Sequence, residues 1–348
     1  MHYNSTKIWK VSLKGVHLLL LLMLILVLVV EGYTLITVYT EGNAALPATF
    51  GNFERVRALL ADNGQRKAFS FAVAGDTQGT GTFEKLAGLL KEEPISFLVL
   101  LGDCVRNGRP GFHQYLRAEL AEELRMPCPT FYVVGNHDVS KDEFPISRFE
   151  EMYGPTNFSF DYQGCLFIVL RILDKPRYST EESLAFLESI LSARRRDYKK
   201  VFVFMHIPPP VSADFVARKF ENPDKFIALC DKFKVDYIIA GDYHGYARVQ
   251  HRDTVYLVTG GGGGHLEKEK PGAFHHVVLI TVGPQAVSER ILFTKRAEEF
   301  EDILERWAIA DVYSWMSKNV WATITLNLII VCCCTLVLRR LLRRRQSR

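Results

Sequence analysis

The chain has 348 residues, of which 48% are hydrophobic and 24% charged, and its formal net charge is +4 at pH 7. That length allows one large domain or two small ones. The charge is concentrated at the two ends, which hold nine of the 43 basic residues: Lys7, Lys10, Lys14, Arg339, Arg340, Arg343, Arg344, Arg345 and Arg348. The remaining 34 basic residues accompany all 39 acidic ones, so the rest of the chain has a net charge of −5. Because this middle part lacks a basic footprint, we do not expect it to bind nucleic acid.

The first predicted element is an apolar helix at residues 16–39. Residues 16–30 contain no polar side chain except His17, and a largely apolar run resumes after Glu31. A helix of about 20 apolar residues crosses a bilayer, whereas the apolar part of a signal peptide has about 7–15 residues. The sequence therefore predicts an uncleaved membrane anchor behind a short cytoplasmic segment, residues 1–15. A cleaved signal peptide is the alternative.

The middle of the chain, residues 41–295, alternates between short apolar runs and stretches with helical periodicity. The apolar runs predict strands that are buried on both faces, at 69–74, 96–101, 130–134, 165–170, 201–205 and 237–240. Helices are predicted between them at 82–92, 180–192 and 224–233. After Ala247 the pattern predicts strands alone, at 247–251, 255–259, 275–281 and 286–292. An α/β half followed by a β-rich half indicates one α/β domain of packed sheets with helices outside.

The last predicted elements are a helical connector at 296–318, a second apolar span at 319–338 and a basic tail at 339–348. We expect the connector to lead directly into the span. Lys and Arg favour the cytoplasmic side of a membrane, and they lie before the first span and after the second. The sequence thus predicts an integral membrane protein with two spans and both termini in the cytoplasm. The domain between them is then extracytoplasmic, in a periplasmic, lumenal or exterior space.

Polar side chains follow five of the predicted strands, at the point where each strand ends. The segments are GDTQ at 75–78, GDC at 102–104, GNHD at 135–138, the residue His206 and GDYH at 241–244. The carboxyl ends of strands in α/β sheets meet at one edge, where ligands bind. The glycines that open four of these segments allow sharp turns. This edge would then gather oxygen and nitrogen donors from Asp76, Gln78, Asp103, Asn136, His206, Asp242 and His244.

The order of these segments resembles the calcineurin-like metallophosphoesterase family, whose motifs run Asp-x-His, Gly-Asp, Gly-Asn-His-(Asp/Glu), His and Gly-His-x-His. The resemblance covers residues 69–292. It implies a four-layer α-β-β-α sandwich, flanked in this chain by two transmembrane helices. It also implies a centre with two divalent metal ions, where a hydroxide held between the metals attacks a phosphate ester.

Carried over by position, the resemblance divides the ligands between two metals that share one carboxylate. The first metal would be bound by Asp76, Gln78 and His244. The second metal would be bound by Asn136, His206 and Asp242. Asp103 would bridge the two. His137 would not bind metal but would face the substrate, as general acid or as a donor to a phosphate oxygen.

Two of the ligand positions depart from the family pattern, because Gln78 and Asp242 stand where histidines are usual. Oxygen donors in place of imidazole make the site harder, and hard donors suit Mn²⁺ and Mg²⁺. We therefore expect Mn, with Fe, Zn or Mg as alternatives. Three carboxylates against two divalent ions leave less positive charge than the usual two carboxylates do, which favours phosphodiester or pyrophosphate monoanions over phosphate dianions. A centre that is half-occupied or inactive, because Gln78 or Asp242 misses the metal, is the alternative.

A third departure concerns Arg106, which stands where many family members have an Asp that supports the catalytic His. We expect Arg106 either to hold a phosphate oxygen, for which a planar guanidinium is suited, or to be an exposed surface residue. His137 would then need another partner, such as Asp138.

Five glycines at 260–264 follow the predicted strand at 255–259. No GK[ST] follows them, so they do not form a nucleotide phosphate loop. Related phosphatases have a similar stretch beneath the metal centre, where side chains would not fit. His265, Lys268 and Lys270 come next and are candidates for a substrate rim or for ordinary surface positions.

The two predicted spans indicate a substrate at the membrane surface, such as a phospholipid head group or a lipid-linked sugar phosphate. The expected partners are therefore the membrane and a phosphorylated small molecule or lipid. One alternative is a membrane-held phosphomonoesterase or nucleotide phosphatase. A second alternative is a catalytically degenerate sensor that still binds metal.

Overall fold

The structure is a computed structural model, and it describes residues 13–52, 54–60, 64, 66–174, 178–212, 220–267 and 272–346. Its α/β domain contains two sheets. In order, the strands of sheet A are β11 (Val287–Thr294), β10 (His275–Val282), β1 (Phe69–Ala74), β2 (Ile95–Leu100) and β3 (Thr130–Tyr132). The strands of sheet B are β4 (Phe158–Tyr162), β5 (Cys165–Val169), β6 (Lys200–Met205), β7 (Tyr237–Ala240), β9 (Thr254–Thr259) and β8 (Tyr246–His251).

Both sheets mix parallel and antiparallel pairing, and sheet B has an antiparallel strand at each edge. In sheet A, β1, β2 and β3 run parallel, and β10 pairs antiparallel with β1, with Phe71 opposite Ile280. In sheet B, β5, β6, β7 and β9 run parallel. The carboxyl ends of the parallel strands in each sheet therefore lie at one edge, where the predicted site residues follow.

The inner strands, such as β1, are apolar on both faces because the centre of each sheet is covered on both sides. In β1, Phe71 belongs to the core between the two sheets, whereas the next residue, Ala72, belongs to the core under the helices. The ring of Phe71 stacks on Phe97 with centroids 4.9 Å apart and meets Phe202 of the other sheet edge-on at 5.3 Å. Such aromatic pairs add to the free energy gained by burying the rings.

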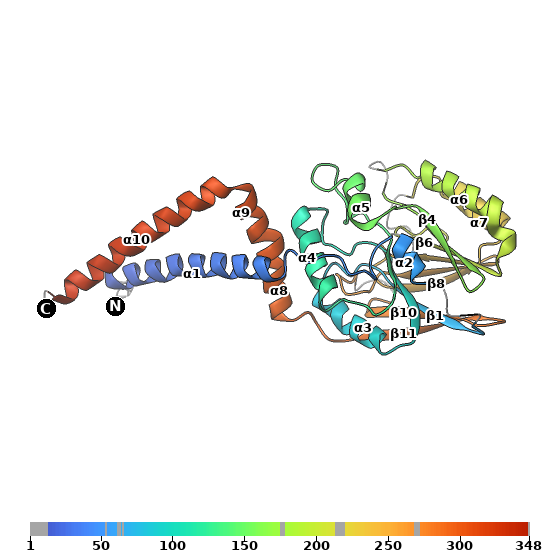
Figure 1. Ribbon diagram of the computed structural model, residues 1–348, viewed down its shortest axis with the longest axis horizontal. Coiled ribbons are helices and arrows are strands. Elements are labelled where there is room, and N and C mark those ends of the chain that lie inside the picture. The colour runs from blue at the N-terminus through green and yellow to red at the C-terminus, as the bar shows by residue number, and fades with distance from the viewer. Residues whose placement is uncertain are drawn as a thin grey trace, which may run out of the picture.

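Helices cover the outer faces of both sheets (Figure 1). The core on sheet A is closed by α3 (Gly81–Lys91), α4 (Pro110–Ala121) and α5 (Ile146–Tyr153). The core on sheet B is closed by α6 (Glu181–Arg194) and α7 (Pro223–Lys232). Two short elements, α2 (Glu54–Ala58) and the 3-10 turn η1 (Arg195–Asp197), complete the domain. The predicted four-layer α-β-β-α sandwich is confirmed, although β4, α4 and α5 were not predicted.

Two helices of the described chain are long and apolar enough to cross a membrane, judged by length and composition. They are α1 (Leu13–Thr40) and α10 (Val320–Gln346), with candidate spans at Gly15–Thr40 and Val320–Arg339. Both project away from the domain and contact each other (Figure 1). Their positions match the spans predicted at 16–39 and 319–338.

The connector between the domain and α10 is helical but bent. It consists of α8 (Phe300–Arg306), the π-helical η3 (Trp307–Tyr313) and α9 (Ser314–Lys318). The backbone of Asn319 is not helical, with φ −125° and ψ 44°, and its N–H bonds to the carbonyls that end α9. The connector leads into α10 through a turn of the chain at Asn319 (Figure 1). The η3 segment packs against α1 and α4 and so joins the first candidate span to the domain.

Candidate metal centre

The polar residues that follow the strands converge at the carboxyl ends of both sheets. Asp76 follows β1, Asp103 follows β2 and His206 follows β6, and all three are fully buried. One ligand atom from each lies within 4.8 Å of the others. A site built from both sheets therefore occupies the edge that the sequence predicted.

His206 is surrounded by oxygen atoms. Its Nε2 lies 3.0 Å from Oδ1 of Asn136, 3.3 Å from Oδ2 of Asp103 and 3.6 Å from Oδ1 of Asp242. Donors bound to one ion at about 2.1 Å are spaced about 3.0–3.4 Å apart in octahedral or tetrahedral shells. The oxygens of Asn136 and Asp103 have this spacing from Nε2, and that of Asp242 lies slightly beyond it. The Nδ1–H of His206 donates to the carbonyl of Leu101 at 2.8 Å, which leaves Nε2 as the candidate ligand atom.

A second group of donors surrounds Asp76. Oδ1 of Asp76 lies 3.3 Å from Nε2 of His244, and its Oδ2 accepts the backbone N–H of Asp242 at 2.9 Å. Gln78 is placed differently, because its side-chain oxygen accepts the backbone N–H of His265 at 3.4 Å. Its backbone N–H donates to the carbonyl of Asp103 at 2.9 Å. Gln78 thus lies in the loop after β1 that also carries Asp76, while its contact with a metal stays a prediction.

The electrostatics of the cluster fit divalent cations. Oδ1 of Asp76 and Oδ2 of Asp103 are buried and accept no hydrogen bond from any described residue. Burial raises the pKa of Asp76 by more than His244 and His206 lower it. Burial also opposes ionisation of Asp103, but His206 and His137 bring its pKa below the ordinary value. Neighbouring buried carboxylates are costly without a counter-charge, and metal ions bound between them would supply it.

The backbone is strained at five of the seven predicted ligands. Their φ angles are positive, at 58° for Asp76, 51° for Gln78, 52° for Asp103, 59° for Asp242 and 56° for His244. Each such residue costs about 1 kcal/mol or more, and strained residues cluster at functional sites. The sequence assigned the sharp turns to the four glycines that open the strand-end segments. Of these four glycines, only Gly102 has a positive φ. The candidate ligand residues themselves therefore make most of the turns.

The glycines are needed because the chain segments approach one another closely. A Cβ atom at Gly135 would lie only 2.2 Å from Oδ1 of Asp103. A Cβ atom at Gly260 would lie 2.7 Å from Oδ2 of Asp76 and 2.5 Å from the backbone nitrogen of His244. The glycine-rich segment at 260–264 thus packs directly against the centre, where the sequence placed it.

His137 lies at the mouth of the site, with 38% of its side chain exposed. Its Nδ1–H donates to the backbone carbonyl of Arg106 at 2.9 Å, and its Nε2 is 3.9 Å from Oδ2 of Asp103. Its backbone N–H donates to Oδ1 of Asp103 at 2.8 Å. The partner of the imidazole is therefore a main-chain carbonyl and not the carboxylate of Asp138, which the sequence offered as a substitute. No side-chain pattern could have identified that carbonyl.

Asp138 is a positioning residue that the sequence did not reveal. Its buried carboxylate accepts four backbone N–H groups at 2.7–3.2 Å, from Gly135, Asp103, Cys104 and Val105. Hydrogen bonds to a charged acceptor are stronger than those between neutral groups. Asp138 thus joins the loops after β2 and β3, which carry Asp103 and Asn136.

Arg106 and His265, which follows the glycines at 260–264, were candidates for contact with the substrate. The side chain of Arg106 is 43% exposed, and its Nη2 lies 3.5 Å from Oε2 of Glu298. Substrate binding by Arg106 stays a prediction, while its pairing with Glu298 was not predicted. His265 is exposed, with its ring 6.3 Å from that of His244. Lys268 and Lys270 lie outside the described residues.

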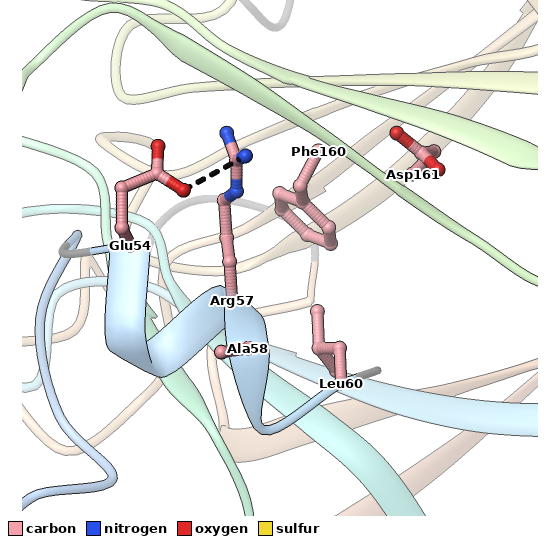
Figure 2. Close-up of a pocket in the computed structure, with 6 residues that line it drawn as sticks. All are labelled: Glu54, Arg57, Ala58, Leu60, Phe160 and Asp161. Carbon is pink, nitrogen blue, oxygen red and sulfur yellow. Dashed lines mark ion pairs between the residues drawn. The ribbon is translucent and has the colours of Figure 1, made fainter. Parts of the chain in front are cut away.

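A cavity of about 320 Å³ lies elsewhere, between α2 and β4. It is lined by Glu54, Arg57, Ala58, Leu60, Phe160 and Asp161. Figure 2 shows Glu54 and Arg57, whose ion pair spans 2.9 Å, near the ring of Phe160. The described lining has none of the metal-ligand geometry found at the strand ends.

The two packed sheets, with a buried carboxylate–histidine cluster at their carboxyl edge, define a metallophosphoesterase-like protein. A family model for calcineurin-like phosphoesterases matches residues 69–246. The chain therefore belongs to the calcineurin-like metallophosphoesterase family, which is a class of hydrolases that act on phosphoric esters.

Solved structures share this fold. GAP50, described as the anchor in the inner membrane complex of Plasmodium, is 15% identical with a TM-score of 0.51, covering 71% of this chain and 96% of that one. Purple acid phosphatase PPD1 from yellow lupin (Lupinus luteus) seeds is 17% identical with a TM-score of 0.55, covering 69% of this chain and 56% of that one. This chain thus spans little more than half of the lupin chain, and such identities show the fold alone. No curated protein sequence matches the chain.

Proposed function

We propose that the protein is a membrane-held, metal-dependent phosphoesterase that hydrolyses phosphodiesters at the extracytoplasmic face of a bilayer. The observation that carries this proposal is the buried cluster of Asp76, Asp103 and His206 at the meeting point of the two sheets. Its supporting features are the Nε2 of His137 at the mouth of the site and the two candidate spans.

Each residue of the site would have a definite task. Asp76, His244 and Gln78 would hold one ion, Asn136, His206 and Asp242 a second, and Asp103 would bridge them. Two such ions, when bound, supply a nucleophile by acidifying water and neutralise charge on the phosphoryl oxygens. His137, whose Nδ1–H is held by the carbonyl of Arg106, can give a proton from Nε2 to the leaving oxygen. The half-exposed guanidinium of Arg106 can hold a phosphate oxygen.

The charge of the centre supports a diester substrate. The carboxylates of Asp76, Asp103 and Asp242 would leave two divalent ions with a net charge of +1. Such a centre attracts a phosphate dianion less strongly than a centre with two carboxylates does. A monoanionic diester carries less charge, so its attraction to the centre is weakened least. The oxygen-rich ligand set supports Mn²⁺ as the metal, ahead of Fe, Zn or Mg.

The placement of the connector supports a substrate at the membrane surface. Lys318 of α9 contacts Glu143, in the loop after His137, at 2.6 Å. Asp311 of η3 contacts Arg109, in the loop after Asp103, at 2.9 Å. The edge that holds the site is therefore on the side of the spans, where a phospholipid head group or a lipid-linked sugar phosphate would be in reach.

The activity can be tested with the full-length protein in detergent, first stripped of metal and then supplied with Mn²⁺, Mg²⁺, Zn²⁺ or Fe²⁺. We expect Mn²⁺ to restore turnover of bis-p-nitrophenyl phosphate, with a higher kcat/KM than for p-nitrophenyl phosphate. A preference for the monoester would instead indicate a phosphomonoesterase. Metal binding without turnover of either ester would indicate a sensor and would contradict the proposal.

The topology can be tested by cysteine labelling in intact cells. Lys199 is exposed on the domain, whereas the four native cysteines of the domain are buried. A Lys199→Cys variant should react with a membrane-impermeant maleimide, and a cysteine appended after Arg348 should react only once the cells are permeabilised. The reverse pattern would place the domain in the cytoplasm.

A further inference from the structure

Glu298 connects two arginine side chains beside the site. Its carboxylate accepts hydrogen bonds from both Nη atoms of Arg306, and the bond from Nη2 spans 3.2 Å. Oε2 of the same carboxylate lies 3.5 Å from Nη2 of Arg106. Arg306 is 5% exposed, so its charge is buried and depends on this partner. Two guanidinium groups thus share one carboxylate.

Both ends of this network reach loops of the metal centre. Nη1 of Arg306 donates to the carbonyl of Gly79 at 3.4 Å, one residue beyond the predicted ligand Gln78. The backbone carbonyl of Arg106 accepts the Nδ1–H of His137 at 2.9 Å. Arg306 therefore contacts the residue that follows the predicted ligand Gln78, and Glu298 contacts the residue whose carbonyl orients the predicted acid, His137.

The two residues come from outside the segment that the family model matches, which ends at residue 246. Arg306 is the last residue of α8, and Glu298 immediately precedes the capping residue of that helix, Glu299. A buried bidentate pair between Arg and carboxylate has a fixed geometry, unlike a single exposed ion pair. Without Glu298, Arg106 would face Arg306 directly, and burial together with Arg306 already lowers the pKa of Arg106.

We propose that Glu298 and Arg306 are positioning residues of the phosphoesterase site, which hold the backbone at Arg106 so that its carbonyl fixes the tautomer and direction of His137. This assignment rests on the proposed function. It makes the connector that leads to the second span a part of the active site.

The test compares two esters in the full-length, Mn²⁺-loaded protein: bis-p-nitrophenyl phosphate and diphenyl phosphate. Phenolate is the more basic leaving group, so diphenyl phosphate depends more on protonation by His137. We expect Glu298→Gln to lower kcat about 10-fold or more for diphenyl phosphate and less than about threefold for the nitrophenyl ester. KM and metal content should stay within about twofold of wild type. A general loosening of the fold would lower both rates alike.

Three further variants make the test specific. Arg306→Lys keeps the charge but loses the bidentate geometry, so its leaving-group effect should be intermediate. In a His137→Ala background, Glu298→Gln should have little further effect on the ratio of the two rates. Asp311→Asn is the matched control, because it breaks a connector ion pair to the same loop, at Arg109, without contact to His137. It should change both rates by less than about twofold.

Equal losses for both esters in Glu298→Gln, or losses in Asp311→Asn as large as those in Glu298→Gln, would overturn the positioning role while leaving the phosphoesterase assignment intact. A wild-type protein that hydrolyses neither ester would overturn the proposed function and this assignment with it. If Glu298→Gln unfolds, the ratio of rates in Arg306→Lys decides the question.

Discussion

Replacing Asp103 with asparagine is expected to remove bound metal and to lower turnover of bis-p-nitrophenyl phosphate by about 10³-fold, because charge stabilisation by two metal ions is worth several kcal/mol. Asp103 is fully buried, and its Oδ2 faces Nε2 of His206 at 3.3 Å. Asparagine keeps an oxygen that can accept the backbone N–H of His137. It removes the negative charge that two divalent cations would share.

The measurement is metal content by elemental analysis together with kcat/KM in the same preparation. Asp161→Asn provides the control, since Asp161 lies on β4 with 59% of its side chain exposed and pairs only with a surface arginine among the described contacts. That variant should keep its metal and its activity. An Asp103→Asn protein that retains both metals and wild-type turnover would show that Asp103 does not bridge them.

The layered fold was predictable because its inner strands are short, continuous runs of apolar residues. Phe71 and Ala72 serve opposite faces of β1, and both are apolar because both faces are covered. A strand between two layers therefore has a continuous apolar run, which the sequence shows directly. Helix α4 was missed because it buries His113 and Glu119, whose polarity masks its apolar stripe.

Which side chains gather at the site was easier to predict from the sequence than how the backbone places them. The order of polar residues after strands indicated which side chains gather at the strand ends, since each has recognisable chemistry. The backbone groups that complete the site have no such signature, and the carbonyl of Arg106 is the clearest case. The left-handed φ angles of Asp76 and Asp103 are also invisible in sequence, because Asp adopts many conformations and the packed sheets impose this one. Glu298 was missed because only the fold brings it back to the loop that follows Asp103.

Replacing His137 with alanine is expected to leave both metals bound and to lower turnover by about 10²–10⁴-fold, the range that general acid catalysis contributes. The backbone N–H of His137 donates to Oδ1 of Asp103 and is unaffected by alanine, so the variant keeps the support that this carboxylate needs. The imidazole is 38% exposed, so its removal leaves no buried cavity. The loss should be larger for diphenyl phosphate than for bis-p-nitrophenyl phosphate, because phenolate needs a proton more than nitrophenolate does.

The same assays with metal analysis decide the role of His137. His251→Ala is the control, because His251 ends β8, away from the strand ends that carry the site. It should match wild type in metal content and in both rates. Loss of metal from His137→Ala would make His137 a ligand rather than an acid, since a residue that only donates protons has no bond to the ions. Equal losses for the two esters would leave the metal centre in place but assign His137 to holding phosphate oxygens, because such a contact stabilises both transition states alike.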